Sequence, residues 1–147
     1  MVSSGTNSQD DEQRTLIDEV VTLRNMAHLR SEVLRRAAQA GLSTDRAESF
    51  AIAVNEAVTN AIEHAGGSGE LAVVQDDQHR LVAEVRDPGA DTGCSITLTM
   101  PPPDAPRGRG MWLAGQLTDH LEVRGDQGGT TVHLEMDLHK QPPEPPG

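Results

Sequence analysis

Two polar side chains interrupt a segment that otherwise has the composition of an apolar helix, VNEAVTNAIEHA at residues 54–65. Glu56 and Asn60 are four positions apart, a separation that places two side chains one above the other on a helix. A carboxylate can accept a proton, and an amide oxygen can help to hold a hard cation such as Mg²⁺, which prefers oxygen ligands. The pair alone is more typical of a solvated edge stripe. Its chemistry therefore depends on what the rest of the chain places beside it.

An acidic residue and a glycine come at the end of a β-rich run further along the chain, in the order Asp87, Pro88, Gly89. The tripeptide taken by itself is an ordinary turn sequence. A carboxylate at a strand end can also accept a hydrogen bond from an exocyclic amine, and a nearby glycine lets a ring lie close to the backbone. The segment is therefore either a simple turn or part of a site for an amine-bearing ring.

A third segment, GRG at residues 108–110, precedes a helix that is expected to begin at Met111. Glycines before a helix N-terminus expose backbone N–H groups and the positive end of the helix dipole, a combination that suits phosphate. Arg109 could add charge-assisted hydrogen bonds to phosphate oxygens. A lone G-x-G is more often a flexible loop, and GTT at residues 129–131 is by itself a hairpin turn that leads into a strand.

The first half of the chain predicts one strand and two helices to carry these groups. RTLIDEVVTL, which begins at Arg14, is rich in β-branched residues and predicts a strand. NMAHLRSEVLRRAAQAGL has apolar residues at helical spacing, with Asn25 placed as an N-cap and Gly41 placed to end the helix. Ser43 or Thr44 can cap the next helix, which contains the carboxylate and amide pair and stops at a Gly-Gly sequence.

The second half predicts two hairpins separated by a long loop and a helix. ELAVVQDDQHRLVAEVRD predicts a hairpin that ends at Asp87. Residues 88–110 contain three consecutive prolines and several glycines, which exclude a continuous helix or an interior strand. A loop of this length inside a small domain is often a functional lid. MWLAGQLTDHL then predicts a helix over 111–121, and EVRGDQGGTTVHLEMDL predicts a second hairpin that turns at residues 126–129.

This order of elements predicts an α+β fold, a two-layer α/β sandwich with helices on one face of a mostly antiparallel sheet. The polar residues 1–13 and the Pro-rich residues 141–147 are expected to be disordered tails. A single domain over residues 14–140 is expected between them, with a core built almost entirely from aliphatic side chains.

Charge and composition narrow the classes of partner and compartment. A formal net charge of −11 argues against direct, non-specific binding to nucleic acid, because phosphate contacts need clusters of Lys and Arg. A protein partner or a small ligand is favoured instead. The single Cys94 can form neither an internal disulfide nor a cysteine-rich zinc site, which fits a reducing cytoplasm. No apolar run is long enough for a membrane helix, and no signal peptide is recognisable, so a cytoplasmic protein without membrane contact is expected.

Taken in order, these weak motifs resemble one superfamily, the histidine-kinase-type ATP-binding domain, also called the GHKL or Bergerat fold. The helix with E-x-x-x-N, the strand ending in D-x-G, the Pro- and Gly-rich loop, the G-x-G before a helix and the final G-T resemble its N box, G1 box, lid, G2 box and closing Gly-Thr. NEAVTNAIEHA, VRDPG, GRGMWLAGQLTD and GGTTVHLEM are similar to segments of the small stand-alone anti-sigma factor serine/threonine kinases. This resemblance covers roughly residues 14 to 138.

The resemblance implies a role for each matching residue on the helix and the strands. Glu56 is implied as the general base that activates the attacking hydroxyl, and Asn60 as the ligand of the Mg²⁺ that accompanies ATP. Asp87 is implied to accept a hydrogen bond from the adenine amine, supported through water by Thr130. Gly89 is implied to pack under the base.

The resemblance also implies that Gly108, Arg109 and Gly110 surround the phosphates beneath the lid. Met111 follows them where the family usually has Leu, a mild change of packing. A second departure is Asp91, which stands where the family often has another glycine of the G1 box. Neither departure touches the implied base or metal ligand, so ATP binding is expected to survive.

Family members of this type act as homodimers, sequester an alternative sigma factor and phosphorylate Ser or Thr of a STAS-type anti-anti-sigma antagonist. The same partners are therefore implied here, with no direct contact to nucleic acid or membrane. Arg30 matches an arginine that contacts partners in that family, although a solvated arginine is an equally good interpretation of it. The alternative function is a catalytically weak ATP-binding adaptor that sequesters some other regulatory protein.

Overall fold

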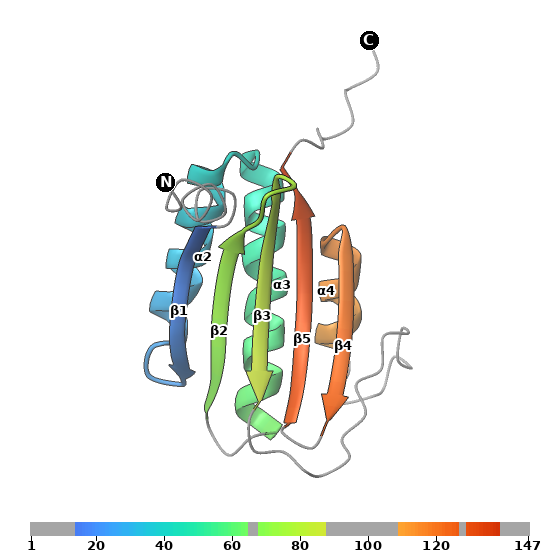
Figure 1. Cartoon of the computed structure of the whole chain (residues 1–147). Helices are drawn as coiled ribbons and strands as arrows, with labels where there is room; N and C mark the ends of the chain where they lie inside the picture. The colour runs from blue at the N-terminus through green and yellow to red at the C-terminus, as the bar shows by residue number, and fades with distance from the viewer. Residues whose placement is uncertain (1–13, 65–67, 88–108, 127–128, 139–147) are drawn as a thin grey trace, which may run out of the picture.

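A five-stranded sheet with helices on one face organises the chain. The computed structural model describes residues 14–64, 68–87, 109–126 and 129–138. Figure 1 shows the sheet edge to edge across the view, with the helices behind it. The elements in chain order are β1 (Arg14–Thr22), α2 (Met26–Ala40), α3 (Thr44–His64), β2 (Ser68–Gln75), β3 (Arg80–Asp87), α4 (Arg109–Leu117), β4 (His120–Asp126) and β5 (Gly129–Asp137).

The strands lie in the order β1-β2-β3-β5-β4, and each neighbouring pair is antiparallel. The helices cover a single face, with α3 behind the middle of the sheet and between α2 and α4 (Figure 1). This arrangement confirms the predicted two-layer α+β sandwich with a mostly antiparallel sheet. None of the helices in the described ranges is both long and apolar enough to cross a membrane.

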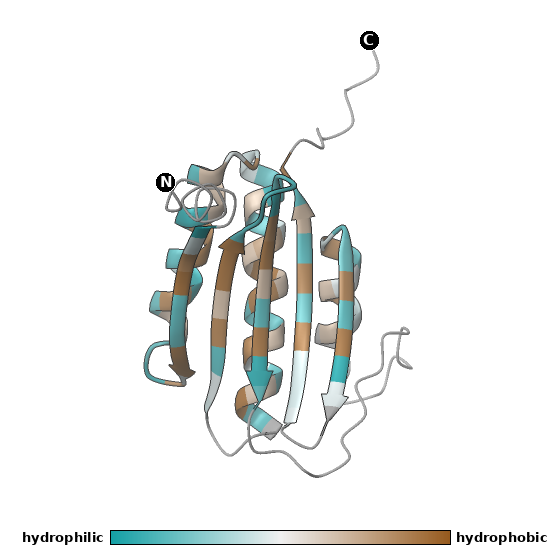
Figure 2. Ribbon diagram, viewed as in Figure 1, coloured by the Kyte–Doolittle hydropathy of each residue, from teal (hydrophilic) through white to brown (hydrophobic). Residues whose placement is uncertain are grey.

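The core lies between the sheet and the helices and follows from the alternation of side chains along each strand. Figure 2 shows this alternation as brown and teal bands along β4 and β5. Phe50 on α3 is fully buried, and the side chains that surround it are aliphatic. The strand residues that are buried on the helix side are Ile17, Val21, Leu71, Val73, Leu81, Ala83, Val85, Val132, Leu134 and Met136.

The α2 helix begins and ends where the sequence predicts, but its first turn lacks a side-chain cap. Gly41 has a φ of 119°, a left-handed conformation that glycine adopts without strain, and its N–H donates to the carbonyl oxygen of Ala38. Asn25 makes no side-chain cap. Its Oδ1 instead accepts from the Thr22 N–H at 2.8 Å, and its Nδ2 donates to the Val20 carbonyl at 2.9 Å. Asn25 therefore occupies the predicted N-cap position, and its carbonyl oxygen accepts from the Leu29 N–H, but its side chain closes the turn from β1 instead of capping the helix.

The start of α3 is fixed by a cap and by a long-range clamp. Ser43 Oγ accepts from the Arg46 N–H at 3.3 Å, so Ser43 rather than Thr44 is the N-cap. The Arg46 guanidinium donates to both carboxylate oxygens of Asp119, at 2.7 and 3.4 Å, and to the carbonyl of Asp137 at 2.9 Å. This clamp ties the first turn of α3 to the end of β5 and to the turn before β4.

The α4 helix is shorter at its C-terminus than the sequence predicted, and it begins two residues earlier. It runs over Arg109–Leu117, and β4 already starts at His120. The Asp119 N–H donates to the Glu135 carbonyl of β5 at 3.0 Å, and the Asp119 side chain is held by Arg46. These tertiary hydrogen bonds draw the segment into the sheet, where the local sequence alone favoured a longer helix.

Candidate functional site

Asp87 and Thr130 face each other at one end of the sheet. The register of β3 and β5 pairs Asp87 with Thr130, two residues beyond the buried pair of Val85 and Val132. Because side chains alternate along a strand, both lie on the helix side of the sheet. Asp87 is only 5% exposed, and it is the one charged residue that is buried among the described residues. A carboxylate in this position is well placed to accept hydrogen bonds from a group inserted between the sheet and the helices.

Glu56 and Asn60 lie on the flank of α3 that turns away from α2. Asn55 and Thr59 mark the opposite flank, since the Thr59 hydroxyl contacts the sulfur of Met26 in α2 at 3.8 Å. Each residue advances the helix by about 100°, so the Glu56 and Asn60 stripe is directed toward the side on which α4 packs. Both side chains are half-buried. Within the described ranges neither makes a hydrogen bond or an ion pair, which leaves a carboxylate and an amide oxygen available.

Several elements begin or end at the end of the sandwich that carries Asp87, which we call the β3 end. The strand β5 starts there, and α3 finishes there because it leads into β2, which runs antiparallel to β3. The strands β3 and β4 run in the same direction, since both are antiparallel to β5. The α4 helix precedes β4 by a tight turn and therefore begins at the same end, as Figure 1 shows. The sequence-predicted residues on α3, β3 and β5 are thus brought to one region of the molecule.

The N-terminus of α4 includes part of the predicted phosphate segment. Arg109 and Gly110 are already helical, so the free N–H groups of the first turn come from these residues rather than only from Met111. Met111 is 4% exposed and packs in the core. Gly108, like the G1-box Gly89, lies outside the described residues. The predicted lid over residues 88–108 and Asp91 lie outside them as well.

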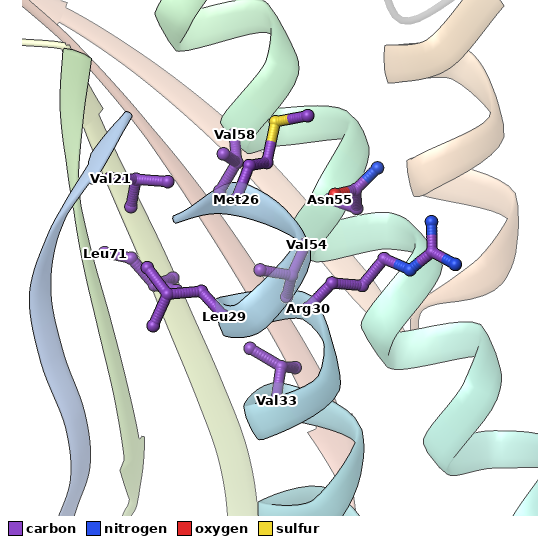
Figure 3. Close-up of a pocket in the computed structure, with 9 residues that line it drawn as sticks. All are labelled: Val21, Met26, Leu29, Arg30, Val33, Val54, Asn55, Val58 and Leu71. Carbon is purple, nitrogen blue, oxygen red and sulfur yellow. The ribbon is translucent and has the colours of Figure 1, made fainter. Parts of the chain in front are cut away.

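Arg30 is exposed on α2 and belongs to a different part of the surface. It lines a small apolar pocket between α2, α3 and the sheet, with Arg30 and Asn55 at its polar rim (Figure 3). Asn55 is on the flank of α3 opposite to Glu56, so Arg30 and Glu56 lie on different flanks of this helix. The remaining lining residues are Val21, Met26, Leu29, Val33, Val54, Val58 and Leu71.

A cluster of titratable side chains occupies the open face of the sheet, away from the helices. The two ring nitrogens of His133 lie 2.9 Å from Glu84 and 2.7 Å from Glu135. Burial opposes protonation of this ring, but the hydrogen bonds to the two carboxylates outweigh it and raise the pKa of His133. Arg80 extends the cluster by contacting Glu135 at 3.3 Å and Asp76 at 2.9 Å. Sequence reasoning did not find this network, which depends on the register of β3 and β5.

Gly69 is a second feature that the sequence did not reveal. It lies at the start of β2, buried beneath α3. A Cβ atom at this position would lie 3.1 Å from the Cβ of Ala61 and 3.1 Å from the carbonyl oxygen of Arg86. In the sequence, Gly69 follows Gly-Gly-Ser and has the composition of a loop, so it gives no local signal of this contact. The contact arises only when the helix packs on the sheet.

Comparison with known proteins supports the same architecture. The family model described as "Histidine kinase-like ATPase domain" matches residues 20–136. No curated protein matches this sequence. Among solved structures, the crystal structure of the RsbU and RsbW domains of Rv1364c from Mycobacterium tuberculosis superposes with a TM-score of 0.59 at 18% identity. The match covers 82% of this chain and 32% of that one, so this chain spans about a third of the other protein's length. At this identity the likeness is one of fold.

Proposed function

Because this chain belongs to the family of histidine kinase-like ATPase domains, we propose that it binds ATP at the β3 end and transfers the γ-phosphoryl group to a protein. The observation that carries the proposal is the pairing of buried Asp87 with Thr130 on the helix side of the sheet. The site lies between the sheet and the helix that presents Glu56 and Asn60. An acceptor for a base amine and a carboxylate for a hydroxyl proton are thereby available in one region.

Asp87 would recognise adenine by accepting a hydrogen bond from its exocyclic amine. A buried acceptor discriminates between bases, because a base that lacks the amine cannot donate this hydrogen bond. Thr130, directly opposite on β5, offers a hydroxyl that can both donate and accept. Gly89 would complete this part of the site by allowing the base to lie close to the backbone.

The phosphates and Mg²⁺ would be held between α3 and the start of α4. Asn60 fits a magnesium ligand, since its amide oxygen is half-exposed and has no partner in the described part of the chain. Mg²⁺ when bound would neutralise phosphate charge. The first N–H groups of α4 and the segment Gly108, Arg109 and Gly110 would donate hydrogen bonds to the phosphate oxygens.

Glu56 would act as the base, one turn before Asn60 on the same flank of α3. Its role is to take the proton from a Ser or Thr hydroxyl as the oxygen attacks the γ-phosphorus and ADP leaves. Phosphoryl transfer depends chiefly on positioning and charge neutralisation, so one carboxylate near the hydroxyl meets the need for a base.

We further propose that the phosphate acceptor is a STAS-type anti-anti-sigma protein and that the chain, as a homodimer, sequesters an alternative sigma factor. The motifs shared with the anti-sigma kinases support this, and Arg30 on α2 is the residue proposed to contact a partner. A formal charge of −11 suits a basic partner such as a nucleic-acid-binding sigma factor.

The experiment that tests this proposal is a pull-down of the tagged protein from its own cells in Mg-ATP, with mass spectrometry of the co-purified proteins. A sigma factor together with a STAS-type protein that carries phosphoserine or phosphothreonine is the expected result. The Glu56→Ala variant is the matched control, and it should retain the partners without phosphorylating them. Partners of another class with no phosphorylation in either sample would refute the kinase function and favour the adaptor.

A further inference from the structure

The strand β2 approaches α3 closely at Gly69. Gly69 is on the helix side of the sheet, and a Cβ there would meet two atoms at 3.1 Å, one on α3 and one on β3. This distance is tighter than most Cβ contacts in proteins, so an added methyl group requires one of the neighbours to move by a few tenths of an ångström. Both atoms belong to packed elements rather than to flexible side-chain ends, so α3 or β3 itself would have to shift.

The two atoms that meet this position belong to residues next to the proposed ligand contacts. The Cβ is that of Ala61, which directly follows Asn60 on α3, and the carbonyl oxygen is that of Arg86, which directly precedes Asp87 on β3. The register pairs Glu70 with Arg86, and one further step sets Gly69 opposite Asp87. Gly69 therefore lies between the helical turn that carries Asn60 and the strand end that carries Asp87.

We infer that Gly69 is a positioning residue whose missing side chain sets the separation between Asn60 and Asp87. The inference rests on the proposed function, because this separation matters when the two residues hold opposite ends of one nucleotide. Asp87 would hold the adenine, and Asn60 would act at the phosphate end through Mg²⁺. A longer separation weakens a ligand that must reach both ends more than a ligand that uses one end.

The test compares two nucleotides on the Gly69→Ala variant at a temperature where the protein is folded. Mg-ATP uses both ends of the site, whereas ADP in EDTA uses the adenine end without the metal ligand. We expect the Kd of Mg-ATP to rise about three- to tenfold, the effect of a misplacement of a few tenths of an ångström. The Kd of ADP in EDTA is expected to change by less than about twofold, because no metal links it to Asn60.

The matched control is Gly115→Ala on α4. A Cβ at Gly115 meets nothing within 4 Å, so this variant makes the same chemical change without a push on any neighbour. Both Kd values are expected to equal those of wild type. A merely structural role of Gly69 would instead lower the unfolding midpoint or weaken both nucleotides equally, and either of these results without a selective loss of Mg-ATP would overturn the inference.

The double variant Gly69→Ala with Ala61→Gly removes one of the two close contacts. It is expected to recover part, but not all, of the lost Mg-ATP affinity, because the carbonyl oxygen of Arg86 still meets the added methyl group. If the single variant does not fold, the two Kd values are compared on the double variant instead. An affinity of the double variant for Mg-ATP equal to that of wild type would overturn the inference. Failure of the wild-type protein to bind Mg-ATP is a different result, since it would refute the proposed function itself.

Discussion

A buried carboxylate is the most informative single residue of the molecule. Removing Asp87 from water costs several kcal/mol of hydration free energy, at least in order of magnitude, unless hydrogen-bond donors surround it. A strand that served only the core would have Val or Leu at this position, as it does at Val85 and Leu81. The burial of Asp87 therefore fits its proposed role in ligand recognition.

The Asp87→Asn variant tests this role through base selectivity. An asparagine side chain can donate to the carbonyl oxygen that the base of ITP has in place of the adenine amine, whereas an aspartate carboxylate can only accept. We expect the Kd of ATP to rise by about tenfold or more, the effect of losing a charged hydrogen bond, while the Kd of ITP changes less or falls. Isothermal titration of both nucleotides gives the ratio within one variant, which a general loss of folding cannot alter. An unchanged ratio would remove Asp87 from adenine recognition.

The Glu56→Ala variant separates binding from chemistry. The side chain is on the flank of α3 that faces the proposed phosphate end, so its loss is expected to leave the Kd of Mg-ATP within about twofold and to lower phosphotransfer about 10²- to 10⁴-fold. Transfer is measured with labelled ATP and the STAS-type protein recovered from the pull-down. Glu48→Ala, an exposed change on the same helix, is the control and should retain wild-type transfer. Equal transfer by Glu56→Ala and wild type would remove the assignment of the base.

Single residues also show how far the sequence can predict a site. Glu56, Asn60 and Asp87 could be selected because polar residues in apolar contexts carry a local signal. Gly69 could not be selected, because its close contact with α3 exists only when the helix packs on the sheet. Met111 belongs both to the core and to the predicted phosphate segment. Its side chain packs in the core, while its backbone belongs to the first turns of α4.

At the scale of elements, the order and type of every helix and strand in the described ranges were predictable from periodicity and turn residues. The details that the sequence missed are those decided by contacts with another element. Asn25 stands at the predicted N-cap position but its side chain closes the turn from β1, and Asp119 leaves the expected helix to pair with β5. Local propensity cannot report either partner, because each partner belongs to another element.

Among the contacts that join one element to another, the Arg46 clamp is the one whose loss we expect to lower the free energy of unfolding most. Its side chain is 15% exposed, and the guanidinium joins α3 to Asp119 and to the end of β5. The Arg46→Met variant keeps much of the stem but removes the three hydrogen bonds that the guanidinium donates, and we expect it to lower the free energy of unfolding by about 2 kcal/mol. Urea denaturation followed by circular dichroism measures the difference.

A matched control for the clamp is Arg35→Met on α2. Arg35 also pairs with an acid, Glu32, but its side chain is 54% exposed and the pair lies within one helix. Such pairs contribute about 0–0.5 kcal/mol, so this variant is expected to unfold at the wild-type urea concentration. Equal destabilisation by both variants would show that the Arg46 clamp has no special role.

At the scale of the whole molecule, the charge is unevenly distributed. The chain carries a net charge of −11, yet residues 24–40 contain four arginines and a single acid. The basic helix α2 is therefore distinct from the acidic remainder, and the sequence alone makes this visible. The sequence does not show that α2 and the Glu56 and Asn60 stripe lie on opposite flanks of α3, because that requires the packing of all three helices.

The network around His133 is expected to make global stability depend on pH. Only the doubly protonated ring can donate to Glu84 and Glu135 at once, and the pKa of His133 is raised in the folded state. The stabilisation is therefore fully present below the unfolded-state pKa of about 6.5, and it is lost as pH rises through the higher folded-state pKa. Its size is expected to stay below about 1 kcal/mol, because Glu84 is 44% exposed and water screens the pair. Arg80 and His120 also face this cluster.

The measurement is the difference in unfolding free energy between wild type and His133→Gln at pH 6 and pH 9, with urea as denaturant. We expect this difference in unfolding free energy, in favour of wild type, to be smaller at pH 9 than at pH 6. His28→Gln, an exposed change on α2, is the control and should show no such pH dependence relative to wild type. A pH-independent difference for His133→Gln would contradict the charged-ring assignment.

The turn that joins β2 to β3 lies at the opposite end of the sandwich from Asp87, because the strands are antiparallel. Its conformation is held by Asp76, whose carboxylate accepts from the N–H groups of Gln78 and Arg80, and His79 accepts from the Leu138 N–H through its carbonyl. The Gln78 side chain itself is exposed and takes part in neither contact. A cysteine introduced there, in a background with Cys94 replaced, gives an attachment point for a fluorophore or a solid support. Immobilised at this point, the protein would present the β3 end and the α2 surface to solution together.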